Sequence, residues 1–128
     1  MAHLEHVNVT VADPKGFAAL LIDLFGWKTR WEGASLDGAG YTVHVGTDDS
    51  YIALYSGSKG APTKMNKSGY NLISACNHIG IIVDDLAAME AKVKAKGFQT
   101  HSHADYEPGR RFYFDTPHDV EIELICYD

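Results

Sequence analysis

The second half of this 128-residue chain repeats the pattern of its first half, which limits the folds that the chain can adopt. The segment 6–13, His-Val-Asn-Val-Thr-Val-Ala-Asp, recurs at 78–85 as His-Ile-Gly-Ile-Ile-Val-Asp-Asp. In each half a helical pattern follows and stops at a glycine before an aromatic residue, at 26–27 and 97–98. A repeat this long with only two copies indicates a duplicated domain half rather than a solenoid array.

Each half is expected to fold as a strand, a helix and three further strands. In segment 4–11 valines alternate with polar residues, which predicts a half-buried strand. Asp13-Pro14 would begin a helix that Gly26 ends. The remaining strands are predicted at about 27–31, 41–45 and 51–55, and in the second half at 76–83, 98–101, 111–115 and 120–127, with a helix at 84–96. The predicted fold class is α+β, with two tandem βαβββ modules forming curved mixed sheets around a cavity.

The length and composition fit a single globular domain. A chain of this size can bury a real core, and 45% of its residues are hydrophobic. Module one is expected to span about 1–57 and module two about 75–128. Residues 58–74 are rich in Gly, Ser, Lys and Asn and are expected to link the two modules.

Charge and cysteine content restrict the partners and the cell compartment. The net charge of −6 and the pI near 5.5 argue against nucleic acid and anionic membranes as partners, so small molecules and protein subunits remain. Cys76 and Cys126 form no CxxC motif and are predicted to be reduced, buried thiols. The N-terminus shows no basic and apolar leader pattern, and a cytoplasmic location is therefore expected.

The repeat brings metal-ligand residue types to equivalent positions. Positions 6, 53, 78 and 123 hold His, Ala, His and Glu. Strand alternation turns His6, His78 and Glu123 away from the valine and isoleucine face, toward one open face. Two imidazoles and one carboxylate leave other coordination positions free for a substrate or dioxygen. We therefore expect these three residues to bind a metal ion, although imidazole suits Fe, Mn, Co, Ni and Zn alike.

Each of these residues also has a simpler interpretation. A strand histidine often only hydrogen-bonds a neighbour, and Glu123 could be a carboxylate at the rim of the sheet. Two histidines at equivalent positions of one face are, however, hard to explain as packing alone. A lone glutamate between Ile122 and Leu124 would cost free energy if it were buried without a partner, so a cation beside Glu123 is the simpler account.

Other residues of the same face are candidates for catalysis or substrate binding. Glu121, two residues before Glu123, could act as a general base or could pair with an exposed cation. Tyr113 could hydrogen-bond a metal-bound oxyanion or only pack. The candidate substrate-binding residues are Asn8, Tyr51, Tyr55 and Arg111, with solvated surface charge as the alternative for the arginine. His101 and His103 form an i, i+2 pair that is interpreted as an exposed strand end rather than as a second metal site.

These features together resemble the vicinal oxygen chelate superfamily. The resemblance is carried by the paired segments 6–13 and 78–85, the βαβββ duplication and the closing segment 112–123, Phe-Tyr-Phe-Asp-Thr-Pro-His-Asp-Val-Glu-Ile-Glu. It covers essentially the whole chain. The group includes glyoxalase I, methylmalonyl-CoA epimerase, extradiol dioxygenases, fosfomycin-resistance thiol transferases and bleomycin-binding proteins. The resemblance implies that His6, His78 and Glu123 occupy the metal positions of the family.

The chain also departs from the patterns of this family. Ala53 stands where glyoxalase I and the epimerases have a fourth ligand, Glu or Gln, and a methyl group cannot coordinate a metal. The three-ligand set is instead similar to that of the extradiol dioxygenases and fosfomycin enzymes. Tyr113, ten residues before Glu123, resembles a dioxygenase tyrosine that faces the substrate. In the same dioxygenase signature a glycine is usual at the position that Asp119 occupies here. His103 lies about one residue away from the position of the upstream histidine of that signature.

The resemblance implies a divalent-metal-dependent enzyme that binds a small oxygenated substrate in bidentate fashion. We expect dioxygenase-like or thiol-transferase-like chemistry, with Fe²⁺ or Mn²⁺ placed ahead of Ni²⁺, Co²⁺ and Zn²⁺. One alternative is a glyoxalase I-type lyase or epimerase with an incomplete ligand set, and another is a metal-free, drug-binding protein of the bleomycin resistance type. Relatives of this length also imply a homodimer with its sites at the subunit interface.

Overall fold

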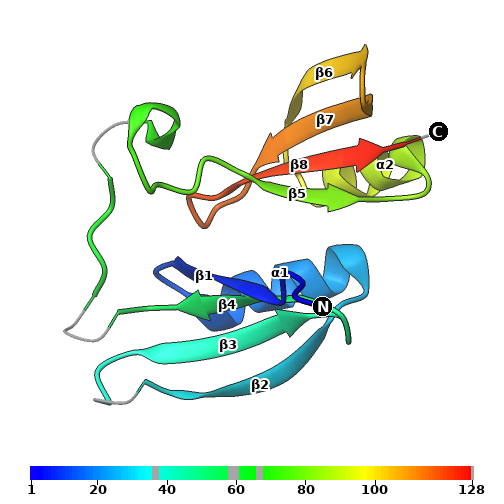
Figure 1. The fold of residues 1–128 in the computed structure, drawn as a ribbon. Helices are drawn as coiled ribbons and strands as arrows, with labels where there is room; N and C mark the ends of the chain where they lie inside the picture. The colour runs from blue at the N-terminus through cyan, green and yellow to red at the C-terminus, as the bar shows by residue number, and fades with distance from the viewer. Residues whose placement is uncertain (36–37, 58–60, 66–67, 128) are drawn as a thin grey trace. The chain divides into compact units, whose positions relative to one another are not determined.

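The computed structural model describes residues 1–35, 38–57, 61–65 and 68–127, which form two compact units, Met1–Lys64 and Met65–Asp128. Each unit contains a four-stranded mixed sheet and one α-helix in the order strand, helix and three strands (Figure 1). The predicted pair of βαβββ modules is therefore confirmed. Residues 58–60 and 66–67 of the expected linker lie outside the described residues, and its later part contains a short 3₁₀ helix, η1 (Gly69–Asn71).

The first unit has the strand order β1-β4-β3-β2. Strand β1 is parallel to β4, and the other neighbours are antiparallel. Helix α1 connects β1 to β2, and the antiparallel strands β2 and β3 then lead to β4. The elements are β1 (His6–Thr10), α1 (Pro14–Phe25), β2 (Lys28–Ala34), β3 (Tyr41–Gly46) and β4 (Tyr51–Tyr55).

The second unit repeats this topology in the order β5-β8-β7-β6, with β5 parallel to β8 and antiparallel pairing elsewhere. Its elements are β5 (Ile79–Ile82), α2 (Leu86–Ala95), β6 (Thr100–Tyr106), β7 (Gly109–Asp115) and β8 (Glu121–Cys126). Both sheets therefore place β4 and β8, the last strands of the modules, next to the first strands. This arrangement is what brings the repeat-related positions of each module together.

Local sequence signals explain where the helices begin and end. Asp13 caps α1, because its Oδ1 accepts a hydrogen bond of 3.0 Å from the backbone N–H of Gly16, and Pro14 occupies the first turn. Gly26 ends α1 in the left-handed conformation, with φ of 69°. Asp85 caps α2 in the same way, with a 3.0 Å hydrogen bond from Ala88. These caps confirm the predicted helix starts in both halves.

Each helix covers one face of its own sheet and leaves the other face to the polar residues. Helix α1 packs on β3 and also contacts β4 and β2, whereas α2 contacts β6 and β8. The largest fully buried side chains are Phe17, Leu21, Leu24, Val43, Val45 and Leu54 in the first unit, and Val93, Phe112, Phe114, Ile122 and Leu124 in the second. Because strand side chains alternate, the residues between these core positions lie on the open face.

The structure differs from the sequence-based expectations at several points. Val7 is 48% exposed although the valine face of β1 was expected to be buried, because β1 is an edge strand and α1 packs mainly on β3. Strand β5 begins at Ile79 and not near Cys76, and Cys76 is exposed, whereas Cys126 is buried as expected. Strand β6 continues to Tyr106, beyond the predicted end. Within the described ranges, no helix is long and apolar enough to cross a membrane.

Candidate functional site

Glu123 lies on the open face of the second sheet, in the interior strand β8. Ile122 and Leu124 on either side are fully buried on the helix-covered face, so strand alternation turns Glu123 the other way. The residue is nevertheless only 8% exposed. Gly80 is its partner in β5, and a Cβ atom at that position would lie 3.8 Å from Oε1 of Glu123. Because glycine has no side chain, it leaves room beside the carboxylate.

Three side chains contact the same oxygen of Glu123. The Tyr113 hydroxyl donates a hydrogen bond to Oε2, Nη1 of Arg111 lies 3.6 Å from Oε2, and Nε2 of His78 lies 3.7 Å from it. The Arg111 side chain is only 10% exposed, so this guanidinium is part of the site and not a solvated surface charge. The protein itself therefore places a cation beside the buried carboxylate. Arg111 is thus a cation of the kind expected beside Glu123, and the role of Glu123 as a metal ligand stays a prediction.

The hydroxyl of Tyr70, from η1, links His78 to Glu121. It donates a hydrogen bond to Oε1 of Glu121 and lies 3.3 Å from Nδ1 of His78. Burial and the hydrogen bond to Glu121 raise the pKa of Tyr70, so the hydroxyl keeps its proton. That proton is directed to Glu121, and the Tyr70 oxygen can then accept one from Nδ1–H of His78. In the neutral ring this arrangement leaves the lone pair on Nε2 of His78, which lies 3.7 Å from Oε2 of Glu123.

His6, the repeat-related histidine of the first unit, has a similar arrangement. Its Nδ1 lies 2.9 Å from Oε1 of Glu5, and this hydrogen bond lowers the pKa of the Glu5 carboxyl. A carboxylate can only accept, so Nδ1 of His6 donates, and in the neutral ring the lone pair is then on Nε2. The ring of His6 stacks on that of Tyr51, with 4.7 Å between the ring centroids. Both predicted metal-binding histidines thus have Nδ1 engaged by a neighbouring oxygen.

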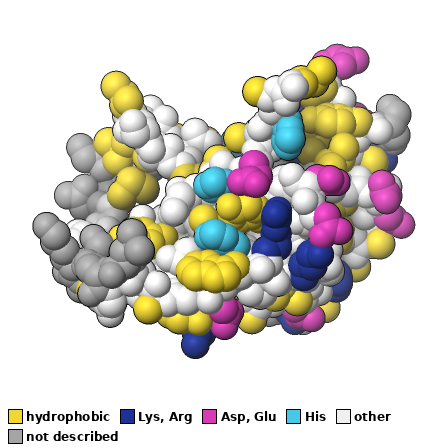
Figure 2. Space-filling view, turned by 60° about the horizontal axis from the view of Figure 1, so that its bottom comes forward, with side chains coloured by type: hydrophobic (Ala, Val, Ile, Leu, Met, Phe, Trp, Pro, Cys, Tyr) yellow, Lys and Arg dark blue, Asp and Glu magenta, His cyan; other side chains and the backbone are white. Residues whose placement is uncertain are grey.

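The stack on His6 continues across the first sheet. The Tyr51 ring stacks on His44 at 4.7 Å, the His44 ring lies 5.2 Å from Trp31, and the Arg30 guanidinium lies 4.5 Å above Tyr51. Figure 2, which colours side chains by type, shows histidine side chains at the surface beside hydrophobic and basic ones. We call Trp31, His44, Tyr51 and His6 the aromatic array. The array offers flat ring faces and Arg30 beside it offers a guanidinium, which suit planar and anionic groups respectively.

His44 was not among the predicted site residues, although its position is informative. It lies opposite Ala53 in the β3–β4 register, at the position where a fourth metal ligand is missing. Burial lowers the pKa of His44, which favours the neutral imidazole. The signal in the sequence was the alternation of His44 with Val43 and Val45. Tyr70 was missed for a different reason, since it belongs to the segment between the modules and follows no strand periodicity.

The predicted site residues divide between the two units. The second unit brings His78, Arg111 and Tyr113 onto Glu123, and it joins Glu121 to His78 through Tyr70. The first unit contains the other four, His6, Asn8, Tyr51 and Tyr55. Among these, Tyr51 stacks on His6, Asn8 is opposite Ala53, and Tyr55 is opposite Thr10. Ala53 itself is only 2% exposed and lies between its strand partners Asn8 and His44.

A pocket of about 260 Å³ lies within the second unit beside the Tyr70 chain of hydrogen bonds. Its walls include Tyr70 and Glu121, together with Cys76 and Asp115. The groups that position His78 are therefore accessible from a cavity large enough for a small molecule or a hydrated ion.

Comparison with known proteins agrees with this fold. The chain belongs to the glyoxalase/bleomycin resistance protein/dioxygenase superfamily, whose sequence profile it matches over residues 3–124. The superfamily resemblance inferred from the repeat is thereby confirmed. None of the curated proteins compared matches the chain by sequence.

Several solved structures share the fold at low sequence identity. The crystal structure of SMU.1112c aligns with a TM-score of 0.79 and 18% identity, covering 98% of each chain. FosX, a fosfomycin resistance protein from Listeria monocytogenes complexed with Mn(II) and sulfate, gives 0.73 and 17%, covering 100% of this chain and 94% of FosX. TnmS3, an antibiotic binding protein from Streptomyces sp. CB03234, gives 0.73 and 15%, covering 100% and 98%. At these identities the likeness concerns the fold.

Proposed function

We propose that this protein is a divalent-metal-dependent enzyme whose ion is held by His6, His78 and Glu123. Its substrate would be a small oxygenated molecule bound through two adjacent oxygens, and the chemistry would be dioxygenase-like or thiol-transferase-like. Superfamily membership supports this class of activity, and FosX provides an example of the fold with Mn(II) bound. Fe²⁺ and Mn²⁺ are placed first because two imidazoles and one carboxylate leave several coordination positions open.

The observation that carries the proposal is that both histidines have Nδ1 hydrogen-bonded to an oxygen of a neighbouring side chain. Nδ1 of His6 lies 2.9 Å from the Glu5 carboxylate, and Nδ1 of His78 lies 3.3 Å from the Tyr70 hydroxyl. In metal sites, the second ring nitrogen of a ligating histidine is almost always held by a carboxylate, a carbonyl or a similar oxygen. Such a bond selects the tautomer and the ring orientation that bind the ion. Histidines that only filled space would not need this arrangement at both repeat-related positions.

The geometry of the second unit fits a divalent ion. Neighbouring ligand atoms of an octahedral ion are about 3 Å apart when each lies about 2.1 Å from the metal. Nε2 of His78 and Oε2 of Glu123 are 3.7 Å apart, so they would need to approach each other by less than about 1 Å. Gly80 leaves space beside the carboxylate. The two residues can therefore act as neighbouring ligands without a change of strand register.

The surrounding residues have distinct roles in this proposal. A bound divalent ion would act as a Lewis acid toward the oxygens of the substrate. Tyr113 would hold Glu123 in place through its hydroxyl, and Arg111 would balance negative charge on the carboxylate and the substrate. Glu121 is proposed as a proton acceptor, because it lies on the same strand and face two residues from Glu123. Asn8, Tyr51 and Tyr55 are proposed as substrate contacts.

A metal-free binding protein is the second candidate, and specific observations favour it. Arg111 offsets the charge of Glu123 without any metal, and the aromatic array offers ring faces for a planar ligand. TnmS3 shows that an antibiotic binding protein can have this fold. A glyoxalase I-type lyase or epimerase is a further alternative. It would need a replacement for the ligand missing at Ala53, and His44 lies opposite that residue.

We further propose that the protein is a homodimer with its sites at the subunit interface. The edge strands β1 and β5 expose apolar side chains, with Val7 at 48% and Ile82 at 63%. Exposed edges with apolar side chains are suited to pairing with a second copy of the chain. A two-fold dimer would build two identical sites at once.

Metal content tests the proposed function directly. Protein purified without added metal, and the same protein titrated with Mn²⁺, should bind an ion that is lost in His6→Ala, His78→Ala and Glu123→Gln. The reason is that three ligands leave no redundancy. His3→Ala is the matched control, since His3 is exposed and outside the site. If His78→Ala binds as much metal as the wild type, the proposed site is wrong, and high affinity for planar drugs without metal would support the binding protein instead.

A further inference from the structure

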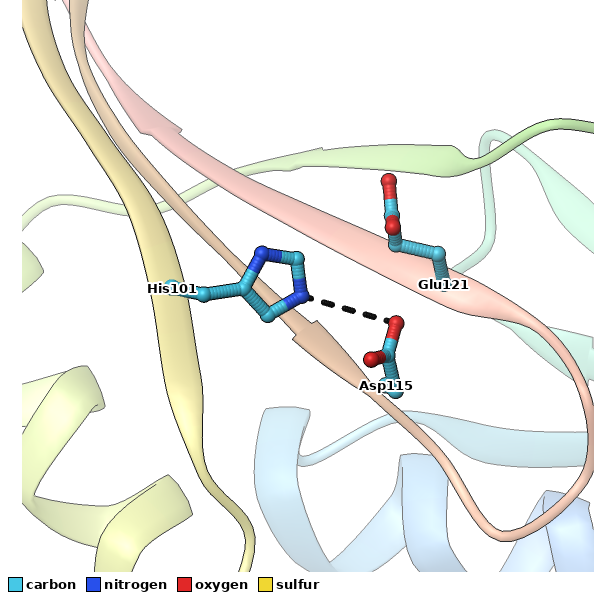
Figure 3. Close-up of side chains that lie close together, drawn as sticks. All are labelled: His101, Asp115 and Glu121. Carbon is cyan, nitrogen blue, oxygen red and sulfur yellow. Dashed lines mark ion pairs between the residues drawn. The ribbon is translucent and has the colours of Figure 1, made fainter. Parts of the chain in front are cut away.

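A second group of metal-ligand residues lies in the second unit, on three adjacent strands. His101 comes from β6, Asp115 from the end of β7 and Glu121 from the start of β8 (Figure 3). Asp115 and Glu121 are direct cross-strand partners. One ligand atom from each of the three residues lies within 4.8 Å of those from the other two. We call these three residues the His101 cluster, and they include neither His78 nor Glu123.

An irregularity in β6 separates His101 from His103. The pairing of β6 with β7 shifts between His101 and Ala104, and Ser102 has φ of 57°. A bulge of this kind changes the face toward which the following side chains point. His101 and His103 therefore lie on different faces of β6. His103 stacks on Phe112 and is hydrogen-bonded to Glu90 of α2, whereas His101 lies beside Asp115. Their i, i+2 spacing alone would have put both histidines on one face.

The His101 ring is held in a state that suits a metal ligand. Its Nδ1 lies 2.8 Å from the Ser102 hydroxyl, whereas its Nε2 is buried, has no hydrogen-bond partner and lies 3.5 Å from Oδ1 of Asp115. A buried polar atom without a partner costs folding free energy, and a bound cation beside this nitrogen would remove that cost. Neighbouring ligands of a tetrahedral zinc ion are about 3.4 Å apart, given bonds of about 2.1 Å. The separation of His101 and Asp115 matches that spacing.

The cluster is also open to an incoming ion. The Asp115 side chain is 74% exposed, and both Asp115 and Glu121 line the pocket of about 260 Å³. Three protein ligands on one side and a solvent-accessible cavity on the other leave coordination positions for water or a small anion. Glu121 already accepts a hydrogen bond from Tyr70 on Oε1, which orients its carboxylate.

We propose that His101, Asp115 and Glu121 form a second divalent cation site, separate from the proposed His6–His78–Glu123 site. One imidazole and two carboxylates suit zinc and similar transition-metal ions. A carboxylate bound to a cation is a weaker base. Filling this site would therefore compete with the role of Glu121 as a proton acceptor and would lower any activity that depends on it.

The test uses the full chain with the first site removed. His6→Ala/His78→Ala serves as the background, and circular dichroism checks its fold. Calorimetric titration of the stripped background protein with Zn²⁺ should show about one ion per chain. Adding His101→Gln or Asp115→Asn should weaken Zn²⁺ binding by more than about tenfold, since the loss of a supporting residue alone has that effect. His103→Gln and Asp105→Asn, on the same strand but outside the cluster, are the matched controls and should not weaken it.

The outcomes separate this proposal from the proposed function. If the background protein binds no Zn²⁺, the His101–Asp115 contact is an ion pair only and the second site does not exist. Equal affinity in the background protein with and without His101→Gln would overturn the proposal as well. In a chain that has both sites, His101→Gln and His78→Ala each remove a different ion. A wild-type protein that loses its only ion with His101→Gln, and not with His78→Ala, has the second site but not the first.

Discussion

Nη1 of Arg111 lies 3.6 Å from Oε2 of Glu123, and both side chains are only 10% exposed. The two residues lie on neighbouring strands, β7 and β8. The guanidinium is the internal partner of a carboxylate that would otherwise be buried alone. This relationship means that Glu123 is electrostatically satisfied before any ion arrives, and that a divalent cation would have to share the carboxylate with an existing positive charge.

Replacement of Arg111 by methionine should therefore destabilise the metal-free protein. Breaking a buried ion pair by removing one partner costs about 3–5 kcal/mol, because the other charge is left uncompensated. Urea unfolding without metal should show this loss, and saturating Mn²⁺ should restore more stability to Arg111→Met than to the wild type. The exposed neighbour Arg110, changed to methionine, is the control. Equal unfolding midpoints for Arg111→Met and wild type in the absence of metal would contradict the assigned role.

Replacement of Tyr70 by phenylalanine should weaken metal binding at His78 without disturbing the fold. The phenol oxygen lies 3.3 Å from Nδ1 of His78 and holds the ring by a hydrogen bond. Loss of such a supporting partner typically reduces metal affinity by about 10–100-fold. Mn²⁺ titration calorimetry would measure the change. Tyr127→Phe, at an exposed position, is the control. If Tyr70→Phe binds Mn²⁺ as tightly as the wild type, the tyrosine does not orient the histidine.

The vacancy at Ala53 provides another test of the proposed metal site. Ala53→Glu would restore a ligand at the fourth repeat-related position, and it should tighten Mn²⁺ binding and block bidentate access of the substrate. Ala53→Leu, which adds a side chain of similar length without a ligand atom, separates coordination from steric effects. Unchanged Mn²⁺ affinity in Ala53→Glu would show that position 53 does not face the ion.

Mixing of inactive variants tests the proposed dimer. If His6 comes from one subunit and Glu123 from its partner, a mixed dimer of His6→Ala and Glu123→Ala has one site with both lesions and one intact site. Random exchange should then restore metal to about a quarter of the sites. Subunit exchange is confirmed separately with differently tagged chains. No recovery despite exchange would mean that each site is built within a single chain.

Because of Glu90, the free energy of unfolding of the second unit should decrease at acid pH. Burial raises the pKa of Glu90, but hydrogen bonds from Thr100 and His103 and the charge of Lys94 bring it below its ordinary value. A carboxyl whose folded pKa is depressed stabilises the protein above its unfolded pKa, and this stability is lost as the pH falls through the folded pKa. Glu90→Gln should therefore cost roughly 1–2 kcal/mol at neutral pH.

The difference between Glu90→Gln and the wild type should shrink on acidification, from about pH 5 downward. Urea unfolding at a series of pH values measures this convergence. Glu107→Gln, at an exposed position, is the control and should follow the wild type throughout. A stability difference that stays constant down to low pH would show that the charge of Glu90 is not what matters.

Much of the fold could be predicted because its signals are local. The caps at Asp13 and Asp85 depend on residues within one helical turn, and both caps are present. The face on which Glu123 lies follows from the period of two along a strand. The same alternation contained His44, but nothing local distinguished that residue from other histidines. The repeat added the pairing of the two modules, and with it the superfamily.

The sequence by itself thus determined the two βαβββ modules and the choice of His6, His78 and Glu123 as candidate ligands, because strand periodicity and internal repetition require no knowledge of distant contacts. Only the tertiary structure decided the surroundings of those residues. Arg111 reaches Glu123 across two paired strands, and Tyr70 reaches His78 and Glu121 from the segment between the modules. The bulge at Ser102, which turns His103 toward Phe112 and leaves His101 beside Asp115, exists only because β6 is paired with β7. Contacts of this kind depend on strand register and chain packing, which no local pattern records.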